Sequence, residues 1–300
     1  MSSEPRRLAV LGAPMESEAL LEGVNLMPGA LRDAGLVDAL SARDLGDLPI
    51  HITDAERDVA TGVVAYRQIV AATGVVRDAA AALLARPELP LVVGGCCGIL
   101  VGIFAALQAT HGRVGLAFAD GHCDCYDAAT SLTGALADME LRVLTGAGPD
   151  ELVGAGSRVP LLRPEDTWVL GVRDGWEMAE AGAPDPLVAL AGASVLDDDA
   201  VRRDPGEAGR AAAAGLVSAP GSFWLHLDLD VLSVAAMPAV DYHLPGGLRW
   251  NELAALLQPL TASPAMLGMD VTIYNPSLDP GRSLAPMIVE LLRDVLAIHA

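Results

Sequence analysis

Apolar runs of strand length alternate with longer helical stretches along nearly the whole chain. Runs of about four to eight apolar residues, bounded by glycine, proline or polar residues, are typical of buried strands. Such runs occupy residues 7–14, 90–95, 113–120, 167–174, 223–230 and 266–276. Ala- and Leu-rich stretches of helical length occupy residues 55–85, 99–110, 186–194, 205–216, 250–259 and 284–298. The alternation predicts βαβ units and therefore an α/β fold, a three-layer αβα sandwich on a mostly parallel sheet.

No linker divides this pattern, so we expect a single domain over residues 1–300. One segment, residues 90–110, carries no charge and is long enough to span a bilayer. Gly94 and Gly95 interrupt it, however, and parallel sheets bury such runs completely. We therefore expect a buried strand, a glycine turn and a buried helix here, and no membrane span.

The charge balance argues against two classes of partner. A net charge of −20 disfavours both nucleic acid and anionic membrane surfaces. All 19 basic residues are arginines, and the absence of lysine excludes a Walker A lysine and a Schiff base. Neither nucleic acid nor an anionic membrane is therefore expected as a partner. The start, "MSSEPRRLAV", has no signal-peptide pattern. The four cysteines are too few for a disulfide scaffold. Both observations favour a cytoplasmic protein with reduced cysteines.

Two acidic residues and a histidine alternate in "FWLHLDLD" (223–230). In a strand, His226, Asp228 and Asp230 would share one face. Carboxylates on one face of a buried strand repel each other, and a divalent cation is the usual remedy. The alternative is an edge strand with a solvated face, although apolar residues flank the segment on both sides.

A second polar cluster, "DGHCD" (120–124), follows another strand-length run. If the segment is extended, Asp120, His122 and Asp124 share a face, whereas Cys123 points away into the core. The alternative is a polar loop without metal. Carboxyl ends of parallel strands meet at one edge, so this cluster and the Asp228 cluster are expected to converge. Asp and His side chains bind manganese, zinc or iron, and carboxylates favour manganese. The two clusters together offer more ligands than one ion needs, so we expect a binuclear site.

With these two clusters, the chain resembles the ureohydrolase family of arginase and agmatinase. The family motifs G-G-D-H, D-A-H-x-D and S-x-D-x-D-x-x-D-P correspond, in the same order, to "GGCC" (94–97), "DGHCD" (120–124) and "HLDLDVLS" (226–233). The segments 12–36, 244–248 and 269–280 resemble the family's opening and closing parts. The resemblance implies an arginase-like fold and an amidinohydrolase whose substrate is a small molecule, a guanidino or amidino compound in which a C–N bond is cleaved. It also implies a hydroxide bridging two divalent metals, usually manganese, and a homo-oligomer, either trimer or hexamer.

By the same resemblance, Asp120, Asp124 and Asp228 would bind one metal together with the residue at the family's G-G-D-H histidine, which is Cys97 here. The other metal would be bound by Asp120, His122, Asp228 and Asp230. A thiolate at Cys97 is a competent ligand and would favour zinc at this position. The alternative is that Cys97 is only a small buried residue and that the site is mononuclear.

Other departures from the family concern acid–base chemistry. The family's proton-shuttling histidine corresponds to Ala137. Asp138 and Glu140 are the nearest acid–base candidates, and His226 is a third, although a purely structural role for His226 is equally open.

The remaining departures concern the substrate. Ile273 and Trp176 stand where the family has acids that select arginine or agmatine, so we expect a substrate other than plain arginine, less cationic or more apolar. The alternatives are a hydrolase of an amide or formimino compound, and a non-catalytic relative that binds metal or ligand.

Overall fold

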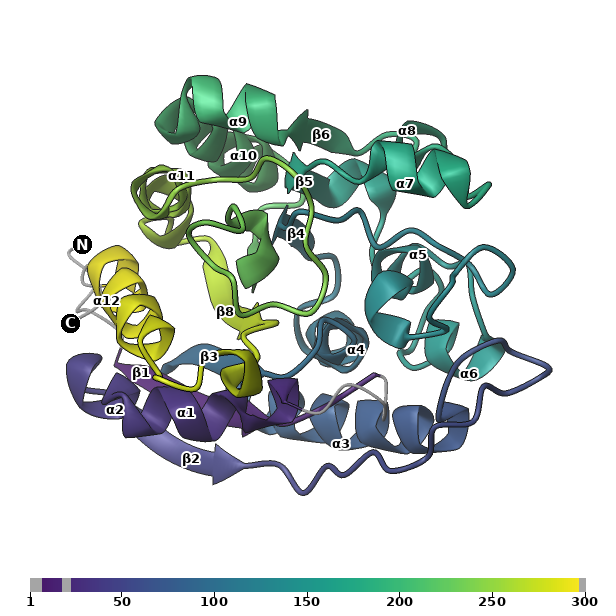
Figure 1. Ribbon diagram of the computed structural model, residues 1–300, viewed down its shortest axis with the longest axis horizontal. Helices are drawn as coiled ribbons and strands as arrows, with labels where there is room; N and C mark the ends of the chain where they lie inside the picture. The colour runs from purple at the N-terminus through teal and green to yellow at the C-terminus, as the bar shows by residue number, and fades with distance from the viewer. Residues whose placement is uncertain (1–6, 18–22, 297–300) are drawn as a thin grey trace.

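Eight strands form one sheet in the computed structural model, which describes residues 7–17 and 23–296. Their order across the sheet is β2-β1-β3-β8-β7-β4-β5-β6, and every described pair is parallel. Figure 1 shows the sheet crossing the molecule from β2 to β6. The strands are β1 (Leu8–Ala13), β2 (Arg43–Asp47), β3 (Leu89–Gly94), β4 (Gly115–Ala119), β5 (Thr167–Val172), β6 (Ser194–Asp197), β7 (Phe223–Asp228) and β8 (Met266–Thr272).

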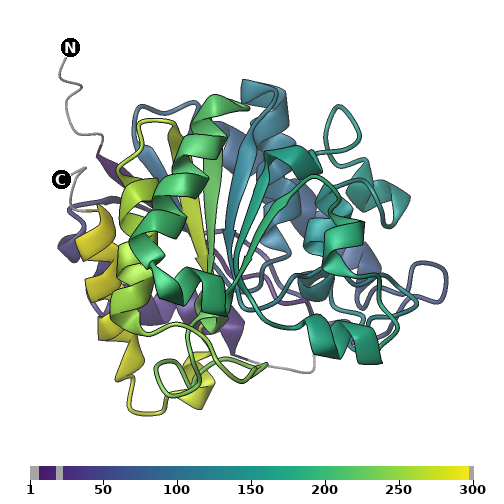
Figure 2. The same cartoon turned by 90° about the horizontal axis from the view of Figure 1, so that it is seen from above.

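Helices cover both faces of the sheet, which confirms the αβα sandwich (Figures 1 and 2). Successive residues of β1 point to opposite faces of the sheet, each of which has its own hydrophobic core. Leu8 and Val10 belong to the first core, and Ala9 and Leu11 belong to the second. The first core is covered by α1 (Met27–Asp33), α2 (Leu36–Ala39), α9 (Asp198–Arg203), α10 (Pro205–Ser218), α11 (Trp250–Thr261) and α12 (Leu284–Leu296). The second is covered by α3 (Tyr66–Leu84), α4 (Ile99–His111), α5 (Glu140–Leu144), α6 (Asp150–Val153), α7 (Gly175–Glu180) and α8 (Pro186–Ala189).

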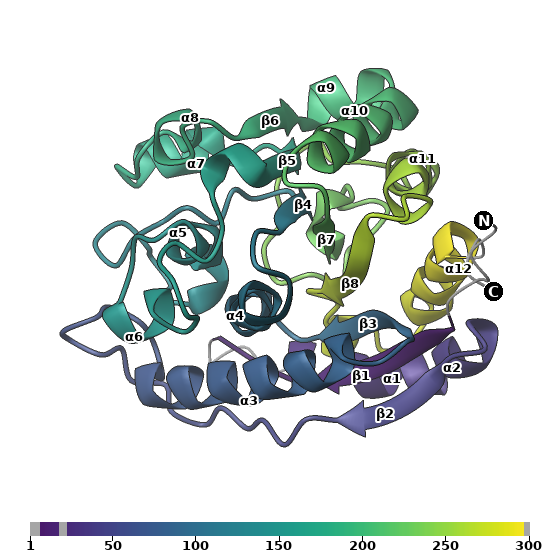
Figure 3. The ribbon, with the colours of Figure 1, turned by 180° about the vertical axis from the view of Figure 1, so that it is seen from behind.

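The uncharged segment 90–110 folds as expected into β3, a turn and α4. Residues 99–108 of α4 are all buried, because α4 packs between the sheet and α3 (Figure 3). A Cβ added at Gly102 would lie 2.7 Å from the carbonyl oxygen of Thr73 in α3, so the glycine permits this close approach. Within the described residues, no helix has both the length and the apolar character needed to cross a membrane.

The two strands at the edges of the sheet, β2 and β6, were not predicted. Their residues are exposed or only partly buried, so they lack the apolar run that marks an inner strand. The helix predicted over 55–85 begins only at Tyr66, because a turn precedes it: Asp58 accepts N–H bonds from Ala60 and Thr61. The stretch 186–194 is helical only to Ala189. Residues 284–296 are helical as predicted, and 297–298 lie outside the described residues.

The middle of the sheet positions the polar motifs. Strands β3, β8, β7 and β4 are consecutive neighbours, so their carboxyl ends lie side by side. The turn "GGCC" follows β3, "DGHCD" follows β4 and the acids of "HLDLD" end β7. The arrangement is typical of open α/β sheets, in which ligands bind beyond the carboxyl ends of the strands.

Candidate metal centre and cavity

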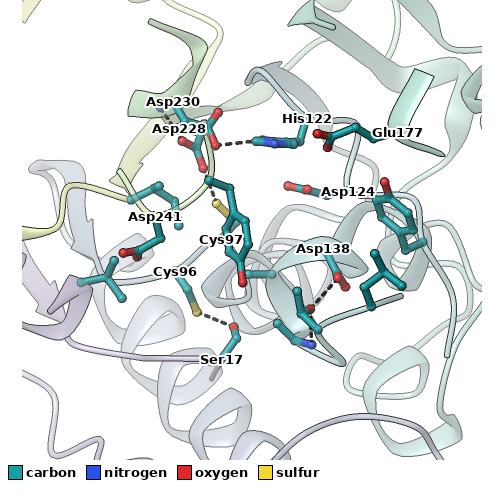
Figure 4. Close-up of a pocket in the computed structure, with 18 of the residues that line it drawn as sticks. Ser17, Cys96, Cys97, His122, Asp124, Asp138, Glu177, Asp228, Asp230 and Asp241 are labelled. Atoms are coloured by element: carbon teal, nitrogen blue, oxygen red, sulfur yellow. Dashed lines mark hydrogen bonds and ion pairs between the residues drawn. The ribbon is translucent and has the colours of Figure 1, made fainter. Parts of the chain in front are cut away.

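A cavity of about 620 Å³ opens at the carboxyl ends of these central strands. Its lining includes Cys97 from the turn after β3, His122 and Asp124 from the loop after β4, and Asp228 and Asp230 from the end of β7 and the turn that follows it (Figure 4). The predicted convergence of the sequence motifs is therefore observed in the geometry.

The loop after β4 is not extended, contrary to expectation. Asp120 follows the last residue of β4, and its Oδ1 accepts the His122 N–H at 2.6 Å, while Asp124 adopts a left-handed φ of 48°. The three side chains therefore do not share a strand face. The tight loop still directs His122 and Asp124 to the cavity floor, with Asp120 fully buried below. Cys123 is buried in the core, as predicted.

The end of β7 follows the predicted alternation only in part. Asp228 is its last residue, and Asp230 lies in the following 3₁₀ turn, η4 (Leu229–Val231). Asp228 Oδ1 accepts the Asp230 N–H at 2.7 Å. Asp230 Oδ2 lies 2.9 Å from His122 Nδ1, and its Oδ1 accepts the Gly121 N–H at 3.1 Å. These bonds tie the β7 loop to the β4 loop.

Cys97 lies in the turn between β3 and α4, in contact with Asp228 at the end of β7. Its Sγ is 2.8 Å from Asp228 Oδ2 and 3.2 Å from Thr272 Oγ1, and the side chain is buried. Burial, with the charges of Asp228 and Glu140, raises the pKa of the Cys97 thiol well above 9. Without a cation, therefore, Cys97 is a thiol that donates to Asp228. Its neighbour Cys96 accepts the Ser17 hydroxyl at 2.8 Å and is also buried.

Burial and mutual repulsion dominate the electrostatics of the acids. Burial raises the pKa of Asp120 to about 6, and burial together with neighbouring carboxylates raises the pKa values of Asp124 and Asp228 well above the usual value. Asp230 is the exception: burial acts to raise its pKa, but His122 outweighs burial and lowers it. Burial alone would lower the pKa of His122, but Asp230 raises it to about 10. The cluster thus carries more carboxylates than its own cationic groups can balance.

The donor groups fit divalent metal ions. Ligand atoms gather within 4.8 Å of one another in three groups, which are Cys97/Asp120/His226/Asp228, Cys97/Asp124/Glu140 and Asp120/His122/Asp230. Among the described residues, Asp120 Oδ2 and His226 Nε2 have no hydrogen-bond partner although both are fully buried. They lie 3.7 Å apart, too far for a hydrogen bond. Buried polar atoms of this kind are expected to be satisfied, and a cation that accepts oxygen, nitrogen and sulfur donors would satisfy them.

The three acid–base candidates lie at different depths. Asp138 lines the cavity, and its Oδ2 accepts hydroxyl protons from Ser131 at 2.7 Å and Thr133 at 2.6 Å. Glu140 begins α5 and is fully buried, as is His226 in β7. Neither Glu140 nor His226 is among the residues that line the cavity.

Two features of the site were missed from the sequence. Glu140 and His226 were not proposed as ligands, yet both fall within the groups of potential metal donors. Asp270 in β8 was not singled out at all, although its carboxylate contacts His226 at 2.5 Å. An acid inside the apolar run 266–276 was the available signal, since a buried acid requires a partner.

The mouth of the cavity combines apolar and acidic side chains. Trp176, Ile273, Leu132 and Tyr242 contribute the larger apolar surfaces. Carboxylates beyond the metal cluster are those of Glu16, Asp138, Glu177, Glu180 and Asp241. Within the described part of the chain, no arginine lines the cavity. Beyond the metal cluster, the described lining is therefore mainly acidic and apolar.

Comparison with known proteins agrees with this geometry. The model of the family described as "Arginase family" matches residues 6–297. Arginase of Bacillus caldovelox is 28% identical over 293 residues, 95% of this chain and 96% of that protein. Arginase of Staphylococcus aureus (strain MRSA252) is 27% identical over 297 residues, 97% of each chain.

Solved structures show the same fold. The native B. caldovelox arginase structure matches with a TM-score of 0.84, at 24% identity, over 97% of this chain and 98% of that one. Formimidoylglutamase from Bacillus subtilis has a TM-score of 0.75 at 18% identity, over 99% of this chain and 88% of that one.

Proposed function

Because the chain belongs to the arginase family, we propose that it is a metal-dependent hydrolase of a non-peptide C–N bond in a guanidino or amidino small molecule. In such a reaction water adds to the central carbon, the C–N bond breaks, and a proton passes to the departing nitrogen. The observation that supports the proposal most is the convergence of Cys97, His122 and four aspartates below one cavity.

We propose two metal positions in this cluster. Cys97, Asp120, Asp124 and Asp228 would hold one ion, and Asp120, His122, Asp228 and Asp230 the other, with Asp120 and Asp228 shared. When bound, a pair of divalent cations would lower the pKa of a water molecule and neutralise developing negative charge. Manganese suits the carboxylate-rich donors, and the thiol of Cys97 moves the preference of its position towards zinc.

Asp138 is the best-placed acid–base group for the reaction. It is the one of the three candidates that lines the cavity, and the Ser131 and Thr133 hydroxyls hold its carboxylate in place. We propose that Asp138 carries the proton to the departing nitrogen, the task that falls to a positioned general acid.

The lining of the cavity supports a substrate other than plain arginine. An α-carboxylate would enter a cavity that holds several carboxylates and, among the described residues, no arginine. Trp176 and Ile273 present apolar surface at the two positions where the family resemblance implies acids that select arginine or agmatine. The acids that remain at the mouth tolerate a positively charged guanidinium. We therefore propose a guanidino compound that has an apolar substituent and no free carboxylate.

The test is product formation by metal-loaded protein. Urea release would be measured with manganese or zinc on arginine, agmatine and a series of N-alkyl- and N-arylguanidines, with mass spectrometry of amide and formimino compounds in parallel. We expect urea from the apolar guanidines and a loss of product in Asp228→Asn. Products only from amide or formimino compounds would move the assignment to that alternative. A fully metal-loaded protein that converts none of the compounds would support the non-catalytic alternative.

A further inference from the structure

His226 occupies an unusual place for a histidine. It lies in the middle of the sheet, two residues before Asp228 in β7, and is fully buried. Strand alternation therefore puts His226 and Asp228 on the same face, with His226 deeper. Its Nε2 points to the acids and not to solvent, since it lies 3.7 Å from Asp120 Oδ2.

The surroundings of Nε2 match a metal site. The ligand atoms of His226, Cys97, Asp120 and Asp228 all lie within 4.8 Å of one another. Two donor atoms bound to one zinc ion, each by a bond of about 2.0–2.3 Å, lie no more than about 4.5 Å apart. The 3.7 Å between His226 Nε2 and Asp120 Oδ2 is within that limit and is longer than a hydrogen bond. Among the described residues, nothing else satisfies Nε2.

The other ring nitrogen is held as ligand histidines usually are. His226 Nδ1 lies 2.5 Å from Asp270 Oδ2, and Asp270 Oδ1 accepts the Trp224 indole N–H at 2.5 Å. A carboxylate that accepts from one nitrogen leaves the lone pair of the other available to a metal. Phe118 stacks on the imidazole, with ring centroids 4.8 Å apart at 23°, and so fixes the plane of the ring.

We propose that His226 is a ligand, through Nε2, of the metal position that contains Cys97, and that Asp270 is the residue that positions it. This inference rests on the proposed metal centre and gives His226 a role other than proton transfer. Each metal position then has one imidazole, His122 in one and His226 in the other. The Cys97 position has sulfur, nitrogen and oxygen donors, so it should prefer zinc or cobalt to manganese more strongly than the His122 position does.

The experiment measures metal binding and not activity. Metal-free wild-type protein, His226→Gln and Asp270→Asn would be titrated with zinc and with cobalt, followed by elemental analysis and by the visible spectrum of the cobalt protein. His51→Gln is the matched control, because His51 is an exposed histidine far from β7 in the sequence. The charge-transfer band from the thiolate to cobalt should be absent in Cys97→Ser. This band therefore reports on the metal position that contains Cys97, which is the marked position.

We expect His226→Gln to weaken zinc binding at the marked position at least about 100-fold, and Asp270→Asn about 10- to 100-fold, with the second position unchanged. The charge-transfer band should shift in both variants and stay unchanged in the control. Zinc absorption fine structure of the wild type should show one sulfur and one imidazole at that position, a result that does not depend on how the variants fold.

Two results would overturn the assignment. One is a His226→Gln protein with wild-type zinc affinity and spectrum, and the other is a sulfur-bound zinc without an imidazole in the wild type. Both leave the proposed hydrolase intact, because the metal is still bound. A wild-type protein that binds no metal would overturn this inference and the proposed function together.

Discussion

Removing metal should reverse the pH dependence of this protein's stability. Burial raises the pKa of Asp120 from 3.8 to about 6. In the absence of metal and between pH 3.8 and about pH 6, Asp120 is therefore protonated in the folded protein but ionised in the unfolded chain. The free energy of unfolding must then fall as the pH rises through this window. Asp124, Asp228 and Glu140, whose pKa values burial also raises, extend the same trend to higher pH.

The magnitude follows from the Asp120 pKa. One pKa unit corresponds to about 1.4 kcal/mol, so the displacement from 3.8 to about 6 amounts to about 3 kcal/mol in full. When the pH rises from about 4.5 to about 7.5, the free energy of unfolding should fall by about 2 kcal/mol because Asp120 loses its proton. Domains are stable by only about 5–15 kcal/mol, so the loss should be readily measured.

With metal bound, the trend should have the opposite sign. The ligands must be deprotonated to bind a cation, so metal affinity and the stability linked to it rise with pH. Urea unfolding would be followed at several pH values between about 4.5 and 7.5, with a chelator and with saturating zinc or manganese.

The isosteric variant Asp120→Asn is the control, because it removes the titrating group and keeps the shape of the side chain. The metal-free variant should lose about 2 kcal/mol less than the wild type over the same pH range. A metal-free wild type that is as stable at the upper pH as at the lower, or an Asp120→Asn protein with the wild-type slope, would refute the argument that this buried carboxylate opposes folding.

Further predictions concern single side chains. Cys97→Ser should lower zinc affinity far more than manganese affinity, because an alcohol is a harder donor than a thiolate, and isothermal titration with each metal checks it. Asp138→Asn should lower kcat about 10²- to 10⁴-fold on the best guanidino substrate with metal content unchanged; an unaltered kcat would remove Asp138 as the acid–base group. Trp176→Ala should lower kcat/KM for apolar guanidines about tenfold and leave small guanidines unaffected, which a comparison across the substrate series would decide. Gly102→Val should destabilise the protein by about 1–3 kcal/mol in urea, because its side chain would meet the α3 backbone, and a neutral result would contradict the close α3–α4 packing.

The architecture and most of the acids that converge below the cavity followed from local sequence patterns. Inner strands of a parallel sheet are buried on both faces, so β1, β3, β4, β5, β7 and β8 were marked by apolar runs. The edge strands β2 and β6 carried no such mark, since only part of their surface is covered. Asp120, Asp228 and their neighbours were recognisable because several acids end otherwise apolar segments, a pattern that costs free energy unless a cation is present.

The tertiary structure decided which of the remaining polar residues meet those acids. His226 and Asp270 lie 44 positions apart in the chain, and the pairing of β7 with β8 places them in register. Glu140 reaches the cluster because the loop after β4 returns to the sheet through α5, whereas Asp138, two residues earlier, faces the cavity. Local patterns record how each segment buries its apolar residues, and they determined the fold and the acids at its strand ends. Contacts between distant strands depend on strand order and register, so only the folded chain could show that the ligand atoms of His226 and Cys97 lie within 4.8 Å of each other.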